Sequence, residues 1–374
     1  MEHRTDLQQI IALTLINGIG NILAKNLIAY LGSVEAIFKE KQQNLAKIPG
    51  IGEVLSKEIV SKNVMQRAEV EMNFIRKKNI SACFYLDSNY PFRLKECEDA
   101  PVLLFMKGNI NLDNNKFVSI VGTRTSTETG RENCKTLVAD LSKNNNNIVI
   151  VSGLAYGIDI CAHRAALENH LPTVAVLAHG LDKIYPPAHK SVAVKILDNG
   201  ALLTEYLSGS NPDKPNFVRR NRIIAGLCDV TVVVETKKKG GSLITARCAN
   251  DYNRDVFAFP GRVTDEYAAG CNELIKTNQA ALIESAADIL RFMNWDIKPD
   301  DKHSKDCQTA LFADLTAEEQ DILRILRAAP NGLQTNEIAI KTGKPFSATS
   351  ARLLTMEFSG WVKLLPGNIY KALI

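Results

Sequence analysis

The sequence has 374 residues, of which 45% are hydrophobic and 23% are charged. These fractions are ordinary for a soluble globular protein and exclude collagen-like, mucin-like and mostly disordered chains. The length predicts two or three domains at about 150 residues per domain. The formal net charge is only +4, so the position of the charges has to be established before they indicate a partner.

Eight cysteines are spread along the chain, and no two lie within four residues of each other. Structural zinc sites usually contain closely spaced cysteine pairs, so we expect no metal site and no bound cofactor. We also expect reduced thiols, because a chain of this length builds its core without disulfides. The first twenty residues lack the basic start and cleavage site of a signal peptide, and no apolar run is long enough to cross a membrane. These features predict a cytoplasmic protein.

Residues 1–75 have a helical pattern that contains an internal repeat. Residues 16–32 and 48–63 each carry Gly-Ile-Gly, then two residues, then an amphipathic segment. This pattern is similar to a doubled helix–hairpin–helix (SAM-like) unit, in which backbone N–H groups at a helix start can face a phosphate. A plain helical bundle with glycine turns remains the alternative. Few lysines accompany the turns (Lys25, then Lys57 and Lys62), so DNA contact here stays open.

Residues 80–115 have ambiguous strand signals, and we interpret them as a connector. From residue 116 to about 292, short apolar runs rich in β-branched residues alternate with helical segments. The runs are residues 116–122, 147–153, 173–180, 201–206, 229–235 and 255–261. Strands that are apolar throughout are buried on both faces, which predicts an α/β fold with a doubly wound, mostly parallel sheet. Ligands of such sheets bind beyond the carboxyl ends of the strands.

The last sixty residues predict a winged helix. A capping box at Thr316 and Glu319 begins the first of three helices, and a hairpin around Pro366-Gly367 follows the third. Winged helices often read duplex DNA through the third helix, but here it carries only Arg352, with Glu357 nearby. We therefore favour a protein-contact or regulatory role for this module. The predicted domains are 1–75 (helical), 76–295 (sheet), 296–312 (linker) and 313–374 (winged helix).

The first predicted strand is followed by the turn VGTRTSTETG, residues 121–130. Gly122 permits close backbone approach, Thr123 offers a hydroxyl, and Arg124 offers a forked cation. A helix is expected to start near Thr127, so that its N–H groups face the same place. This combination suits a phosphate. The turn is not GxGxxG, so no dinucleotide cofactor is predicted.

The second strand is followed by another glycine-rich turn, built from Ser152, Gly153 and Gly157. Asp159 and His163 follow it, one helical turn apart on the same face. An Asp/His pair can serve acid–base chemistry. With no nucleophile in view, we favour the alternative, a buried polar pair that fixes the turn.

The most informative stretch is KPNFVRRNRIIAG, residues 214–226. It places three arginines beside a phenylalanine and an asparagine, namely Arg219, Arg220, Arg222, Phe217 and Asn221. Such a set matches single-strand nucleic-acid binding, with arginine on phosphate, phenylalanine as a stacking platform and asparagine on a base edge. The alternative is a solvated helix start.

A third turn, KKKGGSLITARCA, occupies residues 237–249. Lys239 precedes Gly240, Gly241 and Ser242, and Thr245 lies one turn into the next helix. A Gly-Gly-Ser entry to a helix makes a backbone nest for an anion. Residues 214–247 hold eight Lys and Arg side chains against two carboxylates, a local charge of +6. This region therefore contains a concentrated basic patch, which indicates a nucleic-acid groove.

Nine ordered motifs make the chain resemble the DNA-processing protein A family (DprA, also called Smf). They are IVGTR, SGLAYGID with His163, VLAHGLDKIYP, TEY, FVRRNRIIAGL, VVVE, GGSLITARCA, FAFPG and GCNELI. The resemblance implies an extended Rossmann-like domain, a homodimer and no enzymatic activity. It further implies binding and protection of incoming single-stranded DNA and loading of the RecA recombinase onto it during natural transformation. Two residues depart from the family pattern: Val218 stands where proline is common, and Gly240 where serine is common.

The family's DNA pocket is built from the Gly-Thr-Arg turn and the Arg-Asn-Arg segment. The resemblance therefore points to residues 121–130 and 214–226 of this chain. Together with the anion turns, the predicted DNA or phosphate contacts are Gly122, Thr123, Arg124, Ser152, Gly153, Gly157, Phe217, Arg219, Arg220, Asn221, Arg222, Lys239, Gly240, Gly241, Ser242 and Thr245.

Two enzymatic alternatives remain. A phosphoribohydrolase of the lysine-decarboxylase-like type would share the sheet, but its PGGxGTxxE motif has a catalytic glutamate, and GGSLITARCA has no acid there. A helix–hairpin–helix nuclease would need three converging carboxylates, and only Asp229 and Glu235 flank one strand.

Overall fold

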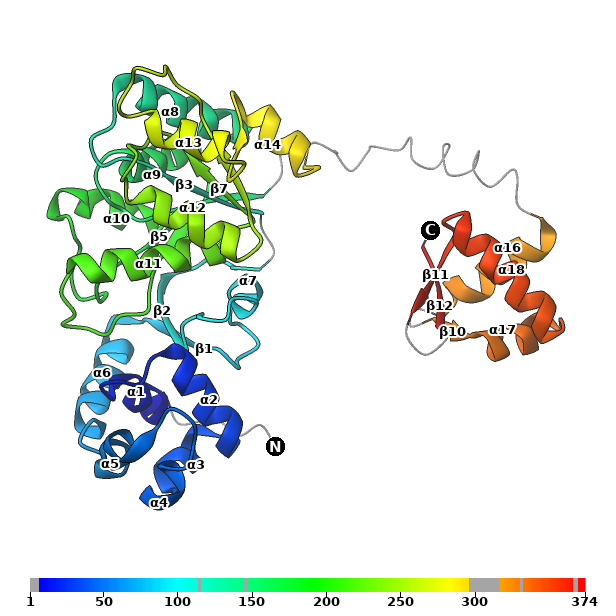
Figure 1. Ribbon diagram of the computed structural model, residues 1–374, viewed down its shortest axis with the longest axis horizontal. Helices are drawn as coiled ribbons and strands as arrows, with labels where there is room; N and C mark the ends of the chain where they lie inside the picture. The colour runs from blue at the N-terminus through cyan, green and yellow to red at the C-terminus, as the bar shows by residue number, and fades with distance from the viewer. Residues whose placement is uncertain are drawn as a thin grey trace. The chain divides into compact units, whose positions relative to one another are not determined.

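The computed structural model describes residues 7–113, 116–143, 147–295, 316–329, 332–365 and 369–373. The chain forms two compact units, Met1–Asp296 and Ile297–Ile374, which we describe separately. Within the larger unit, the N-terminal helices and the sheet pack together (Figure 1). The domain boundaries predicted at residues 75, 295 and 312 remain a proposal.

The larger unit is built on a nine-stranded sheet in the order β1-β2-β6-β5-β4-β3-β7-β8-β9. The strands are β1 (Ser81–Phe84), β2 (Leu103–Gly108), β3 (Lys116–Val121), β4 (Ile148–Ser152), β5 (Thr173–Val176), β6 (Gly200–Thr204), β7 (Val230–Val233), β8 (Asp255–Ala258) and β9 (Ala281–Leu282). All six predicted strands are present, and they pair in parallel from β6 to β8. The doubly wound, mostly parallel α/β fold is confirmed.

The segment that we interpreted as a connector contributes two strands. β2 pairs antiparallel with β6, and β1 pairs antiparallel with β2. The connector interpretation is therefore wrong for these residues. Their signal was ambiguous because β1 has only four residues and burial along β2 declines towards Gly108.

Alternating side chains of the central strands enter two different cores, as the two-residue period of a strand requires. Val118 and Ile120 face α8 (Glu128–Ser142), α9 (Ile158–Glu168) and α14 (Ala286–Phe292). Phe117 and Val121 face the opposite layer of α7 (Phe92–Lys95), α11 (Lys214–Leu227), α12 (Ser242–Asp251) and α13 (Ala269–Lys276). η1 (Pro187–His189) leads into α10 (Lys190–Ile196), which packs beside β5 and β6. This double covering explains why these strands are nearly all apolar.

The chain order reverses at β3. Strands β3 to β6 extend the sheet to one side, and β7 then returns to pair with the other edge of β3. In doubly wound sheets the ligand crevice lies at such a switch point, outside the carboxyl ends of the two strands. The loops after β3 and β7 are therefore brought together.

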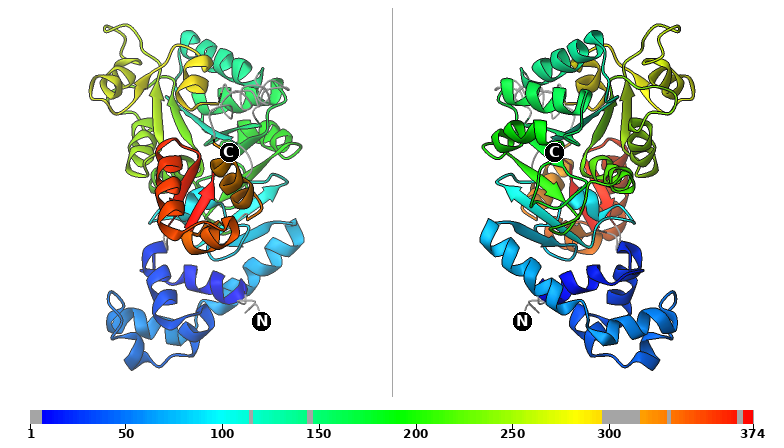
Figure 2. Two further views of the ribbon diagram at one scale, coloured as in Figure 1. Left: turned by 90° about the vertical axis from the view of Figure 1, so that its right-hand side faces the viewer. Right: turned by 90° about the vertical axis from the view of Figure 1, so that its left-hand side faces the viewer.

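The N-terminal helices pack against the β1–β2 end of the sheet, as Figures 1 and 2 show. They are α1 (Leu7–Leu15), α2 (Asn21–Leu31), α3 (Val34–Lys39), α4 (Gln42–Leu45), α5 (Gly52–Ser61) and α6 (Met65–Lys78). Gly18 and Gly50 have φ angles of 89° and 87°, which glycine adopts without strain, so both repeated turns form as predicted. Val102, Leu103 and Phe105 belong to the helical core and join it to the sheet.

Among its described residues, the smaller unit has three helices and a three-stranded sheet in the order β10-β12-β11. Its elements are α16 (Ala317–Arg327), β10 (Leu333–Gln334), α17 (Thr335–Thr342), α18 (Phe346–Phe358), β11 (Val362–Leu365) and β12 (Ile369–Ala372). The predicted capping box at Thr316 and Glu319 is present. Arg352 on α18 pairs with Glu318 and Glu319, at 3.3 and 3.5 Å. The predicted linker and the Pro366-Gly367 turn lie outside the described residues.

Candidate nucleic-acid interface

A cavity of about 470 Å³ lies at the carboxyl ends of β3 and β7. We call it the β3/β7 cavity. Its walls come from the turn after β3, from α11, and from the turn that leads into α12. Three of the predicted segments, far apart in sequence, thus meet at the switch point; they contribute Arg124, Phe217, Asn221, Lys239, Gly241 and Ser242.

The turn after β3 lies close to both neighbouring loops. A Cβ atom on Gly122 would lie 2.5 Å from Ile158 Cγ1, so glycine is required there. Thr123 N–H donates to the carbonyl oxygen of Glu235 at 2.7 Å. Arg124 is exposed, and its guanidinium lies over the Phe217 ring, 5.1 Å from the centroid. Within the described part of the chain, Arg124 has no hydrogen bond or ion pair, so its donors are available to a ligand.

The N-terminus of α8 does not face a ligand, contrary to our expectation. Thr127 is the N-cap residue, as predicted. Its N–H and its hydroxyl donate to the Glu235 carboxylate, at 2.9 and 2.6 Å. Glu235 is buried, and its negative charge takes the place at this helix end that we assigned to a phosphate. The anion at α8 is therefore internal.

The turn after β4 is also filled by the protein's own groups. Ser152 is fully buried and donates to the carbonyl oxygen of Ile120 at 2.6 Å. Gly153 N–H donates to Asp159 Oδ2 at 3.2 Å. Gly157 has a φ of 76°, and a Cβ atom there would lie 2.1 Å from the carbonyl oxygen of Thr123. These residues shape the turn, and neither Ser152 nor Gly153 lines the β3/β7 cavity.

His163 lies deep in the same layer, away from the cavity. It is fully buried, and its Nδ1 contacts Thr173 Oγ1 at 2.8 Å. Burial lowers the pKa of His163 to about 3, so the ring is neutral at physiological pH. Asp159 is buried too and holds the N–H of Gly153. The burial and the hydrogen bonds of His163 and Asp159 support the favoured interpretation, in which they are buried polar groups that fix the turn.

The three arginines of α11 point in three directions, because successive helical residues are about 100° apart. Arg220 is only 3% exposed, and its guanidinium donates to the carbonyl oxygens of Gly153, at 2.7 Å, and Val176. Burial lowers the pKa of Arg220 to about 10, and nearby Asp159 opposes this shift. The interpretation of a solvated helix start is therefore wrong for Arg220, which remains charged and binds the turn after β4.

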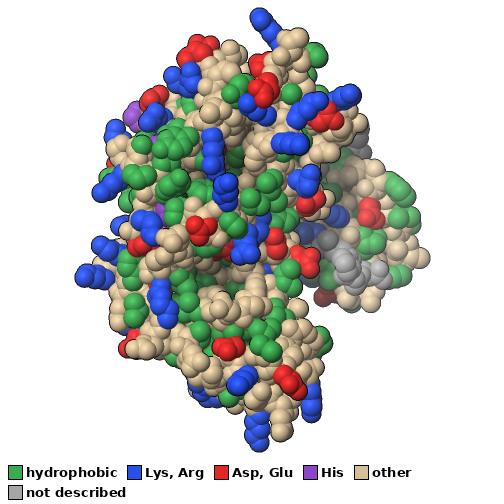
Figure 3. Space-filling view, turned by 60° about the vertical axis from the view of Figure 1, so that its left-hand side comes forward, with side chains coloured by type: hydrophobic (Ala, Val, Ile, Leu, Met, Phe, Trp, Pro, Cys, Tyr) green, Lys and Arg blue, Asp and Glu red, His purple; other side chains and the backbone are tan. Residues whose placement is uncertain are grey.

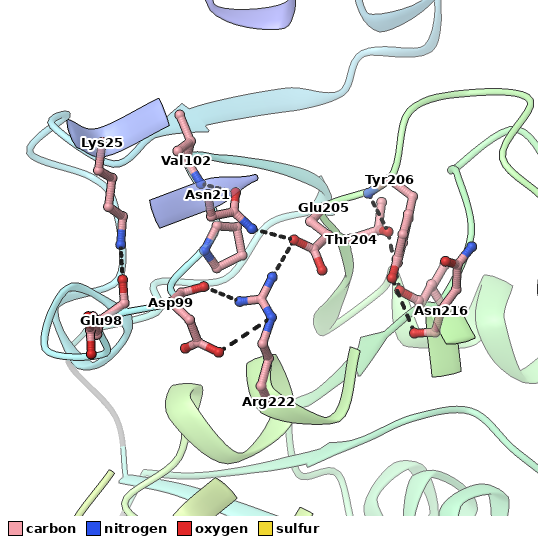
Figure 4. Close-up of polar contacts among 12 residues, drawn as sticks. Asn21, Lys25, Glu98, Asp99, Val102, Thr204, Glu205, Tyr206, Asn216 and Arg222 are labelled. Atoms are coloured by element: carbon pink, nitrogen blue, oxygen red, sulfur yellow. Dashed lines mark hydrogen bonds and ion pairs between the residues drawn. The ribbon is translucent and has the colours of Figure 1, made fainter. Parts of the chain in front are cut away.

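Arg222 points away from the β3/β7 cavity, towards the N-terminal helices. Its guanidinium pairs with Glu205 and donates to the carbonyl oxygen of Asp99 at 2.6 Å. Asn21, the first residue of α2, donates to the same Glu205 carboxylate at 3.2 Å (Figure 4). Arg219 lines a separate cavity of about 610 Å³ beside Asn21. The basic side chains of residues 214–247 thus belong to different sites and do not form one patch.

Replacing Arg222 with alanine is expected to loosen the N-terminal helices and to leave oligonucleotide affinity nearly unchanged. The loss of charge-assisted hydrogen bonds should cost about 2–3 kcal/mol. Limited proteolysis should release the helices of residues 7–78 faster than in the wild-type protein. Arg247→Ala, at an exposed position on α12, is the control. A large loss of affinity with unchanged proteolysis would contradict this assignment.

The turn into α12 is open, unlike the other two. Its N-cap residue is Gly241, no side chain caps it, and the first turn contains no acidic residue. Among the residues described, none accepts a hydrogen bond from the N–H groups of Gly241 or Ser242. A Cβ atom on Gly240 would lie 2.0 Å from Thr236 Oγ1, so glycine is required there. Buried Thr245 lines the cavity below this helix start.

Two lysines add positive charge beside this turn. Lys239 and Lys214 are exposed and line the cavity. We did not predict Lys214 as a site residue, although it is the first residue of the segment KPNFVRRNRIIAG that we singled out. Lys237 lines the cavity but is paired with Glu266 at 3.0 Å. On the face shown in Figure 3, Lys and Arg side chains are numerous over the larger unit and alternate with hydrophobic ones.

The described residues give no sign of a metal centre or a membrane segment. Among them, no three His, Cys, Asp or Glu side chains are grouped to hold a metal ion. Asp229 and Glu235 lie at opposite ends of β7 and bind different partners, Arg93 and Thr127. In the same part of the chain, each helix is too short or too polar to cross a bilayer.

Fold and cavity together define a doubly wound α/β protein with an uncapped helix N-terminus at its switch point, joined to a helix–hairpin–helix module and a winged helix. The sequence comparison is more specific. The chain belongs to the DNA recombination-mediator protein A family, whose profile matches residues 81–294. The profile of the DprA winged helix domain matches residues 308–368, and that of the SAM-like helix–hairpin–helix tandem matches residues 10–62.

Relatives of known sequence and structure match large parts of this chain. The DNA processing protein DprA of Streptococcus pneumoniae is 45% identical over 205 residues, which cover 55% of this chain and 71% of that protein. Protein Smf of Synechocystis is 31% identical and covers 95% of this chain and 96% of its own length. The X-ray structure of the pneumococcal protein matches with a TM-score of 0.63 and 35% identity, over 76% of this chain and 96% of that one.

A second solved relative is DNA processing protein A from Helicobacter pylori, described for its unique single-stranded DNA binding mode. It matches with a TM-score of 0.52 and 33% identity, over 58% of this chain and 96% of that one. The predicted family membership and fold are confirmed.

Proposed function

We propose that the β3/β7 cavity binds single-stranded DNA. The observation that carries this proposal is the meeting of three groups in one cavity: the open N-terminus of α12, the unpaired Arg124 guanidinium and the Phe217 ring. The open helix end and the arginine attract phosphate, and an aromatic ring stacks on any base. The single-stranded DNA binding of the Helicobacter pylori relative supports the same assignment.

The residues divide the work by position. A phosphate accepts hydrogen bonds from the N–H groups of Gly241 and Ser242, while Lys239 adds charge. A neighbouring phosphate is bound by Arg124. A base stacks on Phe217, and the Asn221 side chain reaches its edge. Asn221 Nδ2 already lies within hydrogen-bond distance of the Gly241 carbonyl oxygen, at 3.3 Å, so base and phosphate contacts are neighbours.

We expect this cavity to bind an unpaired base more tightly than a base pair. Stacking on Phe217 needs an accessible base face, which a duplex hides between its neighbours. The Arg124 guanidinium over the Phe217 ring narrows the entrance to that face. We therefore expect weak duplex binding at this cavity.

The wider role is a proposal that rests on the family. We propose that the protein protects incoming single-stranded DNA in natural transformation and loads the RecA recombinase onto it. We also propose a homodimer; β9 is an edge strand with Leu282 49% exposed, and Val263, in the loop after β8, is 94% exposed. A mediator of this kind binds without catalysing a reaction. Glu235, which the nuclease alternative would need as a metal-binding carboxylate, accepts hydrogen bonds from Thr127.

Fluorescence anisotropy titrations with single-stranded and duplex oligonucleotides at several salt concentrations test the binding proposal. Single strands are expected to bind more tightly, and the logarithm of the affinity should fall linearly with that of the salt concentration, since counterions are released. Preference for duplex would overturn the proposal. Release of free base from AMP by the purified protein would instead favour the phosphoribohydrolase alternative. RecA-dependent strand exchange on protein-coated DNA tests the loading role.

A further inference from the structure

A second groove adjoins the β3/β7 cavity. It has a volume of about 450 Å³ and lies between α8 and α9, and we call it the α8–α9 groove. Arg124 and Thr125 line both the groove and the cavity, so the two share a wall. Of the other groove residues, Gly157 is the one that we predicted from the sequence as a DNA or phosphate contact.

Basic side chains line the α8–α9 groove from both helices. Arg131 and Lys135 lie four residues apart on one face of α8, and Arg164 faces them from α9. Lys135 and Arg164 are exposed and have no hydrogen bond or ion pair within the described ranges. At 1.5 Å per residue, Lys135 lies about 6 Å further along α8 than Arg131. Glu168, at the end of α9, is the one carboxylate among the lining residues.

The positions of these cations are fixed at the end nearest the cavity. Arg131 donates to the carbonyl oxygen of Ser126 at 2.6 Å, so its guanidinium is tied to the turn that follows Arg124. The N–H of Ile158 donates to the carbonyl oxygen of Thr123 at 3.2 Å, which ties the start of α9 to the same turn. The basic row therefore begins at Arg124 and continues between the two helices.

An aromatic ring accompanies the charges. Tyr156 is 49% exposed and lines the groove. Its ring packs edge-on against His189, with centroids 4.9 Å apart and an angle of 68°. His189 is buried and holds the Leu154 carbonyl oxygen at 2.7 Å, so this support is rigid. The exposed part of the Tyr156 ring is available as a second stacking platform, next to the phosphate-binding charges.

We propose that a single DNA strand leaving the β3/β7 cavity past Arg124 continues along the α8–α9 groove. Lys135 and Arg164 bind its phosphates, Arg131, which pairs with Glu128, marks the start of their row, and Tyr156 stacks on one of its bases. This inference rests on the proposed function of the β3/β7 cavity and extends it. A compact anion such as a free nucleotide would need one cluster of donors. The cations of the groove instead lie in a row along α8 and α9 that begins at Arg124, an arrangement that suits an extended strand.

The double variant Lys135→Gln, Arg164→Gln tests the inference with two probes, oligothymidylates of about six and about twenty nucleotides. Both side chains are exposed, so the fold should be retained. Affinity for the long probe is expected to fall about tenfold near 0.1 M salt. The slope of the logarithm of its affinity against the logarithm of the salt concentration should decrease in magnitude by about 1.4, or about 0.7 for each lost phosphate contact. Affinity for the short probe, which fills the β3/β7 cavity alone, should not change. Tyr156→Ala should likewise weaken only the long probe.

A matched control removes one lysine and one arginine elsewhere on the larger unit. Lys195→Gln on α10 with Arg291→Gln on α14 changes the net charge by the same amount, and both side chains are exposed. Equal losses for this control and the groove variant would overturn the inference, as would an unchanged long-probe affinity or an equal loss for both probes. If the wild-type protein binds neither probe, the proposed function itself fails, and the inference fails with it.

Discussion

Replacing Arg220 with alanine is expected to destabilise the larger unit by about 3–5 kcal/mol, the range found when one member of a buried charged set is removed. The Arg220 guanidinium joins α11 to the ends of two strands through the carbonyl oxygens of Gly153 and Val176. Its removal leaves both acceptors, and the buried Asp159 carboxyl, without this partner. Burial raises the pKa of Asp159 and Arg220 lowers it, so the variant also favours the protonated acid.

Urea unfolding measures this loss, and a second substitution tests its cause. In the double variant Asp159→Asn, Arg220→Ala no carboxylate remains uncompensated, so part of the stability should return. Arg219→Ala, one residue away and exposed, should unfold like the wild-type protein. An Arg220→Ala protein of unchanged stability that has lost only oligonucleotide binding would show that Arg220 contacts DNA directly and would contradict the positioning role.

Replacing Arg124 with alanine is expected to weaken single-stranded DNA binding by about 10–100-fold, since a hydrogen bond to a charged group contributes about 1.5–3 kcal/mol. Arg124 is exposed, and its one contact among the described residues that involves the guanidinium is with the Phe217 ring, at 5.1 Å. Its loss should therefore leave the unfolding free energy nearly unchanged. The salt slope should become less steep by about 0.7, because one phosphate contact is lost.

Anisotropy titration and urea unfolding on the same preparation separate affinity from stability. The conservative variant Arg124→Lys keeps the charge but loses the forked donor, so it should recover only part of the affinity. Phe217→Ala in the Arg124→Ala background should lose less affinity than it does alone, because the two side chains are in contact. An Arg124→Ala protein with wild-type affinity would exclude the β3/β7 cavity as the DNA site.

Much of the fold was predictable from sequence because its signals are local. Runs such as residues 230–234 are nearly all apolar, as a doubly covered strand requires. The capping box at Thr316 and Glu319 is likewise a contact between residues three positions apart. β1 and β2 escaped prediction, because a short antiparallel edge acquires its stability from neighbours that the segment itself does not encode.

The segments that form the candidate site were predicted from the sequence. Which of their residues line the cavity and which bind other parts of the protein was decided by the structure. Gly122, Gly157 and Gly240 could be recognised as turn residues, since close backbone approach requires glycine wherever the chain later folds. The partners of charged side chains could not be recognised. Glu235, which follows the neighbouring strand β7, accepts hydrogen bonds at the α8 N-terminus, and its sequence distance of 108 residues from Thr127 hides the contact.

The sequence by itself therefore determined the α/β class, the positions of six strands along the chain, the glycine turns and the family. These depend on the period and composition of short segments and on ordered motifs. Only the tertiary structure decided which of the neighbouring cations serves which purpose: Arg220 is buried as a positioning group, Arg222 pairs with Glu205, and Arg124 remains available to a ligand. The physical reason is that the state of a charge depends on its burial and on partners distant in sequence, which a local pattern does not specify.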